Sequence, residues 1–325
     1  MMGSRRGCLP VILAGLLAVI ALGWFFGGWF TAGPLAKETA FIVPEGSSLS
    51  SVADKLERDG AISSASAFKL RARILAGGAP IKAGEFLLPK GSSPSQILRI
   101  IQGDEVLRRF VTVPEGMPSI MVYERLMAQP NLTGSIEVPA EGSVLPDTYE
   151  IEKGQSRQAV LLRMQTAMQR TLSELWPKRA KDIAVSTPAE ALALASIVEK
   201  ETGKPSERTV VAGLYSNRLK QGIMLQADPT IIYPITKGKP LGRRIRQSEI
   251  QAVNDYNTYS MVGLPKGPIT NPGRASIEAV LNPAKTDVLY MVADGTGGHQ
   301  FAKTLEEHNA NVEKWYTLRK ARGDF

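Results

Sequence analysis

The segment Thr187–Gly203, TPAEALALASIVEKETG, contains the beginning, the apolar face and the end of one predicted helix. Thr187 and Glu190 have the spacing of a capping box, and Pro188 stands at the first helical position. Gly203, with the Lys-Pro pair that follows it, is a typical stop signal. We therefore expect a helix over residues 188–202 that packs its apolar side chains into the core of a folded domain.

Glu201 lies on the face of this helix that is predicted to be buried. Successive helical residues are rotated by about 100°, so Leu194, Ile197 and Val198 form one apolar face with Glu201 in its middle. By the same rotation Glu199 points about 160° away from Glu201. Burial and the negative end of the helix dipole both raise the pKa of a carboxyl group, as a general acid near neutral pH requires. The alternative is a glutamate that turns out to solvent or pairs with Lys204, and the helix alone leaves both open.

The elements predicted around this helix indicate an α+β fold, because strands and helices do not alternate as they do in a doubly wound sheet. Helices are predicted at residues 49–58, 63–75, 93–102, 158–175, 207–221 and 305–322, and strands at residues 81–88, 108–113 and 287–293. The sequence Val-Pro-Glu-Gly occurs at residues 43–46 and again at 113–116, each time before a helical pattern. We interpret this repeat as one strand–turn–helix arrangement used twice, with an ancestral duplication as the alternative.

The N-terminal run from Leu9 to Phe30 is apolar throughout its 22 residues. A helix of about 20 apolar residues spans a bilayer, so this run predicts a single transmembrane helix. Arg5 and Arg6 precede the run and predict a cytoplasmic N-terminus, with the rest of the chain outside the cytoplasm. A cleaved signal peptide is the alternative, although no Ala-X-Ala cleavage site follows the run.

Composition narrows the class of protein further. The 325 residues are 43% apolar and 22% charged, which is typical of a folded protein. The net charge of +8 is spread along the chain, without the clustered basic patch of a nucleic-acid-binding protein. Cys8 is the only cysteine, so structural disulfides and cysteine-based metal sites are excluded. We predict three parts: residues 1–37 with the N-terminus, anchor and linker, a small module at 38–108, and a larger domain at 109–325.

The segment Ala195–Thr202, ASIVEKET, resembles the signature of the endolytic murein transglycosylases, the YceG-like family. Other blocks of the chain also match that family, and they occur in the same order as in the family over about residues 110 to 315. They are Glu141-Gly142, Pro146–Tyr149, Asn217–Leu219, Gln226–Thr230, Tyr256–Tyr259, Gly263–Pro265, Asn271–Gly273, Val292–Gly295, Gly298-His299 and His308-Asn309. Residues 38–108 resemble the LysM-like subdomain of the family. Ala227 is a departure, because some relatives have threonine there.

The resemblance implies a lyase that cleaves peptidoglycan glycan strands internally, between N-acetylmuramic acid and N-acetylglucosamine. It implies that Glu201 is the catalytic acid and then the base, that the products end in a 1,6-anhydro sugar, and that neither a metal nor a cofactor is required. The implied partners are glycan strands, the inner membrane and peptidoglycan synthases, near which the enzyme would end strand growth. A hydrolase that uses the same glutamate with water, or a non-catalytic peptidoglycan-binding scaffold, is the alternative.

Substrate contacts are expected from a set of polar and aromatic residues in the matched blocks. They are Glu141, Gln226, Asp228, Thr230, Tyr256, Asn257 and Asn271. Each also has a structural interpretation: residues 226–230 have the composition of a loop around Pro229, and a loop rich in tyrosine can pack on the core. His299 is expected to have a structural role, and with His308 as the only other histidine a zinc site is not expected.

Overall fold

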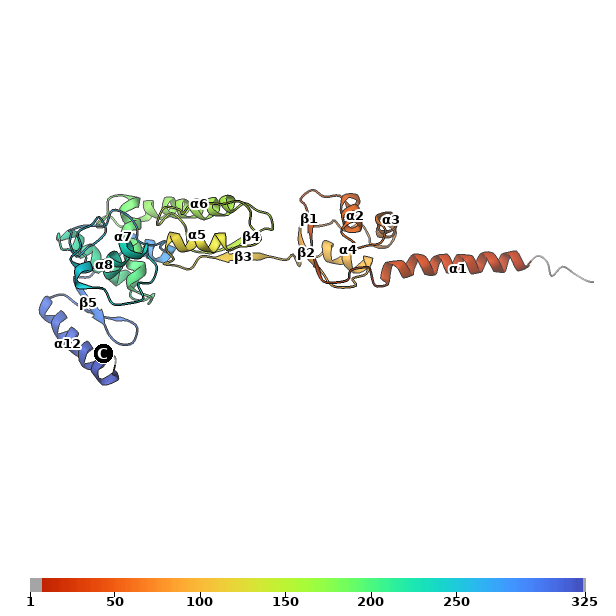
Figure 1. Cartoon of the computed structure of the whole chain (residues 1–325). Helices are drawn as coiled ribbons and strands as arrows, with labels where there is room; N and C mark the ends of the chain where they lie inside the picture. The colour runs from red at the N-terminus through yellow and green to blue at the C-terminus, as the bar shows by residue number, and fades with distance from the viewer. Residues whose placement is uncertain (1–7, 324–325) are drawn as a thin grey trace, which may run out of the picture. The chain divides into compact units, whose positions relative to one another are not determined.

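The computed structural model describes residues 8–323 and divides the chain into two compact units (Figure 1). The first unit ends at Arg108 and the second begins at Arg109. Helices predominate in both, and the strands of the described residues pair into three antiparallel sheets of two strands each. The mixed α+β class predicted from the sequence is therefore confirmed.

The first unit packs a two-stranded sheet against short helices. Its elements are α1 (Cys8–Phe30), β1 (Thr39–Val43), α2 (Leu49–Arg58), α3 (Ala65–Leu75), β2 (Gly84–Leu88) and α4 (Pro94–Gln102). Strands β1 and β2 are antiparallel, and Phe41 lies opposite Phe86. Both phenylalanines are buried together with Phe68 of α3, so this unit has a core of its own.

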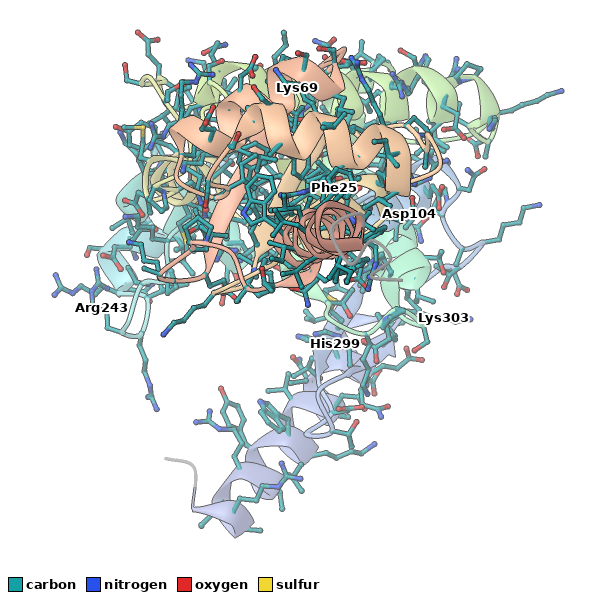
Figure 2. The ribbon with its side chains drawn as sticks, turned by 90° about the vertical axis from the view of Figure 1, so that its right-hand side faces the viewer. Phe25, Lys69, Asp104, Arg243, His299 and Lys303 are labelled. Carbon is teal, nitrogen blue, oxygen red and sulfur yellow. The ribbon has the colours of Figure 1, made fainter. Side chains whose placement is uncertain are left out.

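Helix α1 is apolar and largely exposed over most of its length, and its last turns pack against the module (Figure 2, in which α1 is seen end-on with Phe25 labelled). Residues Ile12–Phe30 are long and apolar enough to cross a membrane, which is compatible with a single-pass anchor or a signal sequence. Trp29 is only 3% exposed and packs on Phe68. The guanidinium of Arg71 donates hydrogen bonds to the carbonyl oxygens of Gly28 (3.1 Å) and Trp24 (3.3 Å). Arg5 and Arg6, from which the orientation was predicted, lie outside the described residues.

The second unit is built around helices α7 and α8. Its elements are β3 (Arg109–Thr112), α5 (Ser119–Met127), β4 (Thr148–Ile151), α6 (Arg157–Leu175), the 3₁₀ turn η1 (Trp176–Lys178), α7 (Pro188–Glu201), α8 (Arg208–Lys220), α9 (Asp228–Thr236), α10 (Gln247–Ile250), α11 (Arg274–Leu281), β5 (Tyr290–Ala293), β6 (His299–Ala302) and α12 (Leu305–Arg322). Strand β3 pairs with β4, and β5 pairs with β6. The hairpin of β5 and β6 packs against α12.

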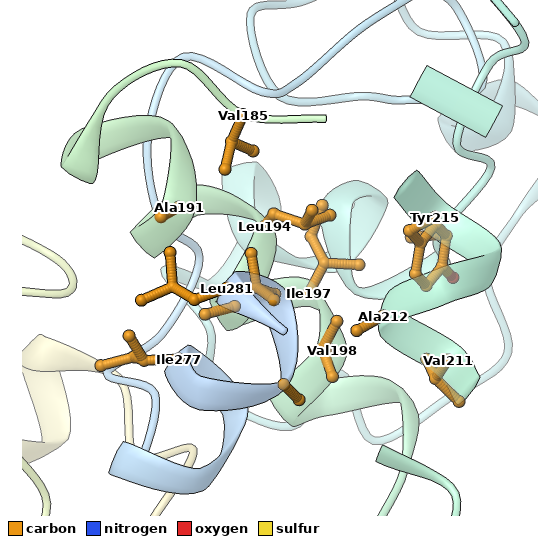
Figure 3. Packing of buried hydrophobic residues seen from close by; sticks show 14 of the residues in the cluster. Val185, Ala191, Leu194, Ile197, Val198, Val211, Ala212, Tyr215, Ile277 and Leu281 are labelled. Carbon is orange, nitrogen blue, oxygen red and sulfur yellow. The ribbon is translucent and has the colours of Figure 1, made fainter. Parts of the chain in front are cut away.

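Helix α7 is the centre of the core in this unit. Leu194, Ile197 and Val198 are fully buried, as their shared face predicted, and Figure 3 shows them beside residues of α8 and α11. The buried surface is wider than one face, because Ala191 and Ala195 are also inaccessible to solvent. Helix α7 packs against α8, α9 and α11, so small side chains are needed where these neighbours approach it closely.

The repeated Val-Pro-Glu-Gly sequence forms the predicted strand–turn–helix arrangement in both places. Gly46 and Gly116 have φ angles of 74° and 71°, a left-handed conformation that glycine adopts without strain. Each turn is followed by a helix, α2 or α5, that buries a valine and a leucine at equivalent positions. The structure therefore supports one local arrangement used twice.

One local prediction was wrong and another was confirmed. Residues 226–230 were expected to form a loop, but α9 begins at Asp228, because an acidic residue and a proline in the first turn also start a helix. The stop signal predicted at Gly203 is confirmed, because α7 ends at Glu201, two residues before it. The chain leaves the helix at Thr202, which adopts an extended conformation with φ of −138°.

Candidate active site

The side chain of Glu201 opens into a cavity of about 450 Å³ in the second unit. The cavity is lined by residues of α7, α8, α9, β5 and α12, and by Tyr259 from the loop after α10. One carboxyl oxygen of Glu201, Oε1, is buried and has no hydrogen-bond partner among the described residues. Tyr215, one of the buried residues labelled in Figure 3, lines the same cavity, and its hydroxyl favours the charged form of the Glu201 carboxyl group. A buried carboxyl oxygen without a partner, on a side chain that lines a cavity, still has a hydrogen bond to make, and a bound ligand can supply it.

The surroundings of Glu201 favour its protonated form. Burial raises the pKa of Glu201 to about 8, and the negative charge of Asp228 adds to this effect. The hydrogen bond from Tyr215 acts in the opposite direction but is outweighed. A carboxyl group with this pKa is mostly neutral near pH 7, so it can donate a proton to a bound ligand.

Arg218 positions Gln226 at the wall of the cavity. Its guanidinium is buried and donates hydrogen bonds to the carbonyl oxygens of Met224 and Leu225, each at 3.0 Å, and to Oε1 of Gln226 at 3.1 Å. Gln226 has a φ angle of 53°, which is uncommon for a residue with a side chain and needs support from its surroundings. The bonds from Arg218 supply that support, and the exposed amide of Gln226 lines the cavity beside Glu201.

Asp228 stands at the first turn of α9 and also lines the cavity. The hydroxyl of Tyr259 donates a hydrogen bond to its Oδ1 atom at 2.7 Å, which fixes the orientation of the carboxylate. Burial raises the pKa of Tyr259, with the bond to Asp228 as the second cause. Of the residues expected to contact substrate, Gln226 and Asp228 are those that the structure brings together with Glu201.

Glu141 lies at another cavity, which shares no lining residue with that of Glu201. Its carboxylate accepts hydrogen bonds from the backbone N–H of Ser119 at 2.8 Å and from the amide of Asn271 at 3.4 Å. Burial nevertheless raises the pKa of Glu141 to about 7. Glu141 thus connects the start of α5 to the loop before α11.

Asn271 and Asn257 are completely buried and hold loops together. The amide of Asn271 donates to the carbonyl oxygen of Met117 at 2.9 Å, and its own carbonyl accepts from the backbone of Val144 at 3.0 Å. The amide of Asn257 donates to backbone carbonyl oxygens at the end of α10 and just after it, the shortest bond being 2.6 Å to Ala252. The structure does not bring either side chain to the cavity of Glu201.

Thr230 and Tyr256 also support the site from outside the cavity. Thr230 is buried, and its hydroxyl bonds to that of Thr258 at 2.8 Å, which ties α9 to the loop that carries Tyr259. Tyr256 packs its ring against that of Tyr233, with the centroids 4.7 Å apart. Neither residue lines the cavity of Glu201.

Three residues that line the cavity were not among the candidates named from the sequence: Tyr215, Arg218 and His308. Tyr215 and Arg218 are one turn apart on α8, a spacing that places them on the same face, and Arg218 lies in the matched Asn-Arg-Leu block. His308 comes from α12 and stacks on Tyr290 with a centroid distance of 5.3 Å, and its buried Nδ1 has no hydrogen-bond partner within residues 8–323. Burial lowers the pKa of His308, and the charge of Arg218 adds to this. No local signal places His308 beside Glu201.

The described residues contain no group of three or more histidine, cysteine, aspartate or glutamate side chains that could hold a metal ion. His299 contacts Glu207, with its Nδ1 atom 2.8 Å from Oε2 of the carboxylate. The cavity of Glu201 presents a neutral carboxyl group with amide, carboxylate and hydroxyl groups around it.

Three comparisons with known proteins agree on one family. The sequence model of the YceG-like family matches residues 41–314. A protein of Bacillus subtilis strain 168 named endolytic murein transglycosylase is 28% identical over 91% of this chain and 91% of its own length. A protein of the same name from Streptococcus pneumoniae D39 is also 28% identical over 91% of this chain, which spans only 63% of that longer relative. The crystal structure of a yceG-like protein from Listeria monocytogenes matches 85% of this chain and 99% of its own, with a TM-score of 0.53 and 28% identity.

Proposed function

The chain belongs to the YceG-like family, and from this membership and the geometry around Glu201 we propose that it is an endolytic lytic transglycosylase of peptidoglycan. It is a lyase, which cleaves the bond between N-acetylmuramic acid and N-acetylglucosamine within a glycan strand. The observation that carries the proposal is the free Oε1 atom of Glu201, on a carboxyl group whose pKa of about 8 keeps it protonated.

In the proposed reaction, Glu201 acts first as an acid and then as a base. Its proton goes to the glycosidic oxygen, the bond from that oxygen to C1 of the muramic acid breaks, and positive charge develops on the sugar ring. The Glu201 carboxylate then takes the proton of the C6 hydroxyl of the same sugar, and O6 bonds to C1. The product is a 1,6-anhydro end, and Glu201 is again protonated. One carboxyl group serves both steps, unlike the two-carboxylate glycosidases, for which lysozyme is the usual example.

Gln226 and Asp228 are proposed to hold the sugar that reacts. The amide of Gln226 offers a donor to N-acetyl and hydroxyl oxygens, and the carboxylate of Asp228 accepts hydrogen bonds from hydroxyl groups. Because Arg218 and Tyr259 fix these two side chains, little conformational entropy is lost when a sugar binds. Glu141, Thr230, Tyr256, Asn257 and Asn271 are proposed to act by positioning the loops around the site.

The test is the product formed from purified glycan strands. Anhydro ends are expected, and their loss is expected in the Glu201→Gln variant, which keeps the shape of the side chain without its acid. Reducing ends without the anhydro ring would show instead that water is the nucleophile and that the enzyme is a hydrolase. Unchanged cleavage by Glu201→Gln would remove the catalytic assignment, and binding without any cleavage by the wild type would favour a scaffold.

We propose further that α1 is a retained inner-membrane anchor with a cytoplasmic N-terminus and a periplasmic catalytic domain. The support is that the end of α1 belongs to the folded module: Trp29 is buried in it, and Arg71 bonds to backbone carbonyls of α1. Removal of α1 as a signal peptide would expose Phe68 and leave the Arg71 guanidinium without these partners. Protein recovered in the soluble fraction, beginning after residue 36, would contradict retention.

The arrangement of parts proposed from the sequence assigns residues 1–37 to the anchor region, 38–108 to a LysM-like glycan-binding module and 109–325 to the catalytic domain. The separate core of the first unit supports a module with its own role. Near the membrane, the enzyme would meet newly made glycan strands and the synthases that extend them. Cross-linking of the membrane-bound chain to a synthase tests that partnership.

A further inference from the structure

A second cavity of about 460 Å³ adjoins the cavity of Glu201. The two have Lys200, Pro229 and Ile232 in common, so the first turns of α9 separate them. The residues proposed to take part in the reaction, Glu201, Gln226 and Asp228, do not line this second cavity. A ligand too large for the catalytic cavity can therefore extend past Lys200 into the second one.

The wall of the second cavity is mostly apolar. Its aliphatic, thioether and proline side chains include Met117, Pro118, Met121, Ile232, Leu241 and Ile269. The aromatic side chains on which sugar rings stack are missing from its lining. Small apolar groups such as methyls fit this wall better than the hydroxyl-covered faces of a glycan.

The same cavity also has two lysines in its lining. Lys200 and Lys239 line it, and Lys239 belongs to the segment 237–246, KGKPLGRRIR, which has five basic residues and no acidic one. Figure 2 shows Arg243 of this segment at the edge of the unit. Partners within the protein satisfy part of this charge, because Lys239 pairs with Glu124 and Arg243 with Glu249. The carboxylate of Glu115 also lines the cavity, but Arg208 lies 3.7 Å from it.

We infer that the second cavity binds the peptide that is attached to the muramic acid next to the cleaved bond. This inference rests on the proposed function and adds a substrate group to it. A short peptide with alanine methyl groups and free carboxylates matches an apolar wall that carries the ammonium groups of Lys200 and Lys239. Its attachment to the reacting sugar brings it to the shared wall at Lys200, so binding of the peptide helps to hold the glycosidic bond beside Glu201.

The experiment compares two substrates with the full-length chain. One is uncross-linked glycan strands that carry their peptides, and the other is the same strands after an amidase has removed the peptides. The wild type is expected to cleave peptide-bearing strands about tenfold faster. In Leu241→Asp, a carboxylate replaces part of the apolar wall, and the ratio of the two rates is expected to fall to about one.

Ile235→Asp is the matched control, because Ile235 is an exposed apolar residue of α9 that does not line the cavity. The same substitution there is expected to leave the ratio unchanged. Lys239→Gln keeps the apolar wall, and it tests the charge of this lysine through a higher KM for peptide-bearing strands alone. Equal wild-type rates on the two substrates, or an equal fall of the ratio in Leu241→Asp and Ile235→Asp, would overturn the inference. If the wild type cleaves neither substrate, the proposed function fails, and the inference fails with it.

Discussion

Replacing Glu201 by glutamine should abolish activity and yet stabilise the protein, increasingly so as the pH rises. The folded chain holds a proton on Glu201 up to a pKa of about 8, whereas the unfolded chain releases it near the ordinary value of 4.5. Between these values the folded state binds more protons than the unfolded state, so a rise in pH lowers the free energy of unfolding. Proton linkage gives a loss of about 3 to 4 kcal/mol between about pH 5 and about pH 8. Glutamine does not titrate, so Glu201→Gln should escape that loss.

The assay is denaturant unfolding of the wild type and of Glu201→Gln at both pH values, followed by tryptophan fluorescence. Trp176 and Trp315 report on the second unit. Glu174→Gln is a control that should destabilise the protein. Hydrogen bonds from Arg274 and Lys178 hold the pKa of Glu174 at about 2, so the stabilising effect of the Glu174 carboxylate is already complete at about pH 5. That variant should lose the same stability at both pH values. If the advantage of Glu201→Gln does not grow with pH, Glu201 is not protonated near neutral pH, and its role as a general acid is refuted.

Three further variants test the surroundings of the site. Asp228→Asn removes the negative charge that helps to raise the pKa of Glu201, so the alkaline limb of the pH–activity profile should move to lower pH; an unmoved limb would assign the raised pKa to burial alone. Glu141→Gln should keep activity within about threefold of the wild type, since Glu141 lies at another cavity. A larger loss in kcat would show that Glu141 contacts the substrate. Arg218→Met leaves the buried carbonyls around Gln226 without their donor and should cost about 2 to 4 kcal/mol of stability, measured by thermal unfolding at fixed pH.

Local signals in the sequence were sufficient for most of the helices. Helix α7 begins at Pro188 with Thr187 as its cap, and the Thr187 hydroxyl accepts a hydrogen bond from the backbone of Glu190 at 3.2 Å, as the spacing predicted. The Glu190 carboxylate, however, bonds to the backbone of Ser186, one residue before the cap. Such details depend on the path of the incoming chain, which no pattern within the helix encodes.

The residues that line the cavity were harder to predict, because their positions depend on tertiary packing. Glu201 was identified by its place on an apolar face, and that argument needs one helix only. Gln226 and Asn257 have similar polar side chains in matched loops, but Gln226 faces the cavity and Asn257 is buried among carbonyl groups. Their roles differ because their backbones differ, and single-residue chemistry does not distinguish them.

The end of α7 explains why distant residues belong to the same site. Thr202 turns the chain out of the helix directly after Glu201, which brings Lys204 and Glu207 to the hairpin of β5 and β6. Lys204 bonds to the hydroxyl of Thr296 at 3.0 Å, and Glu207 accepts a hydrogen bond from the backbone of His299 at 3.1 Å. The hairpin held in this way packs against α12, the helix that carries His308 to the cavity. His299 is thus connected to the cavity through the hairpin, because the contacts that hold it to Glu207 also hold the hairpin, and the hairpin and α12 supply Met291 and His308 to the cavity.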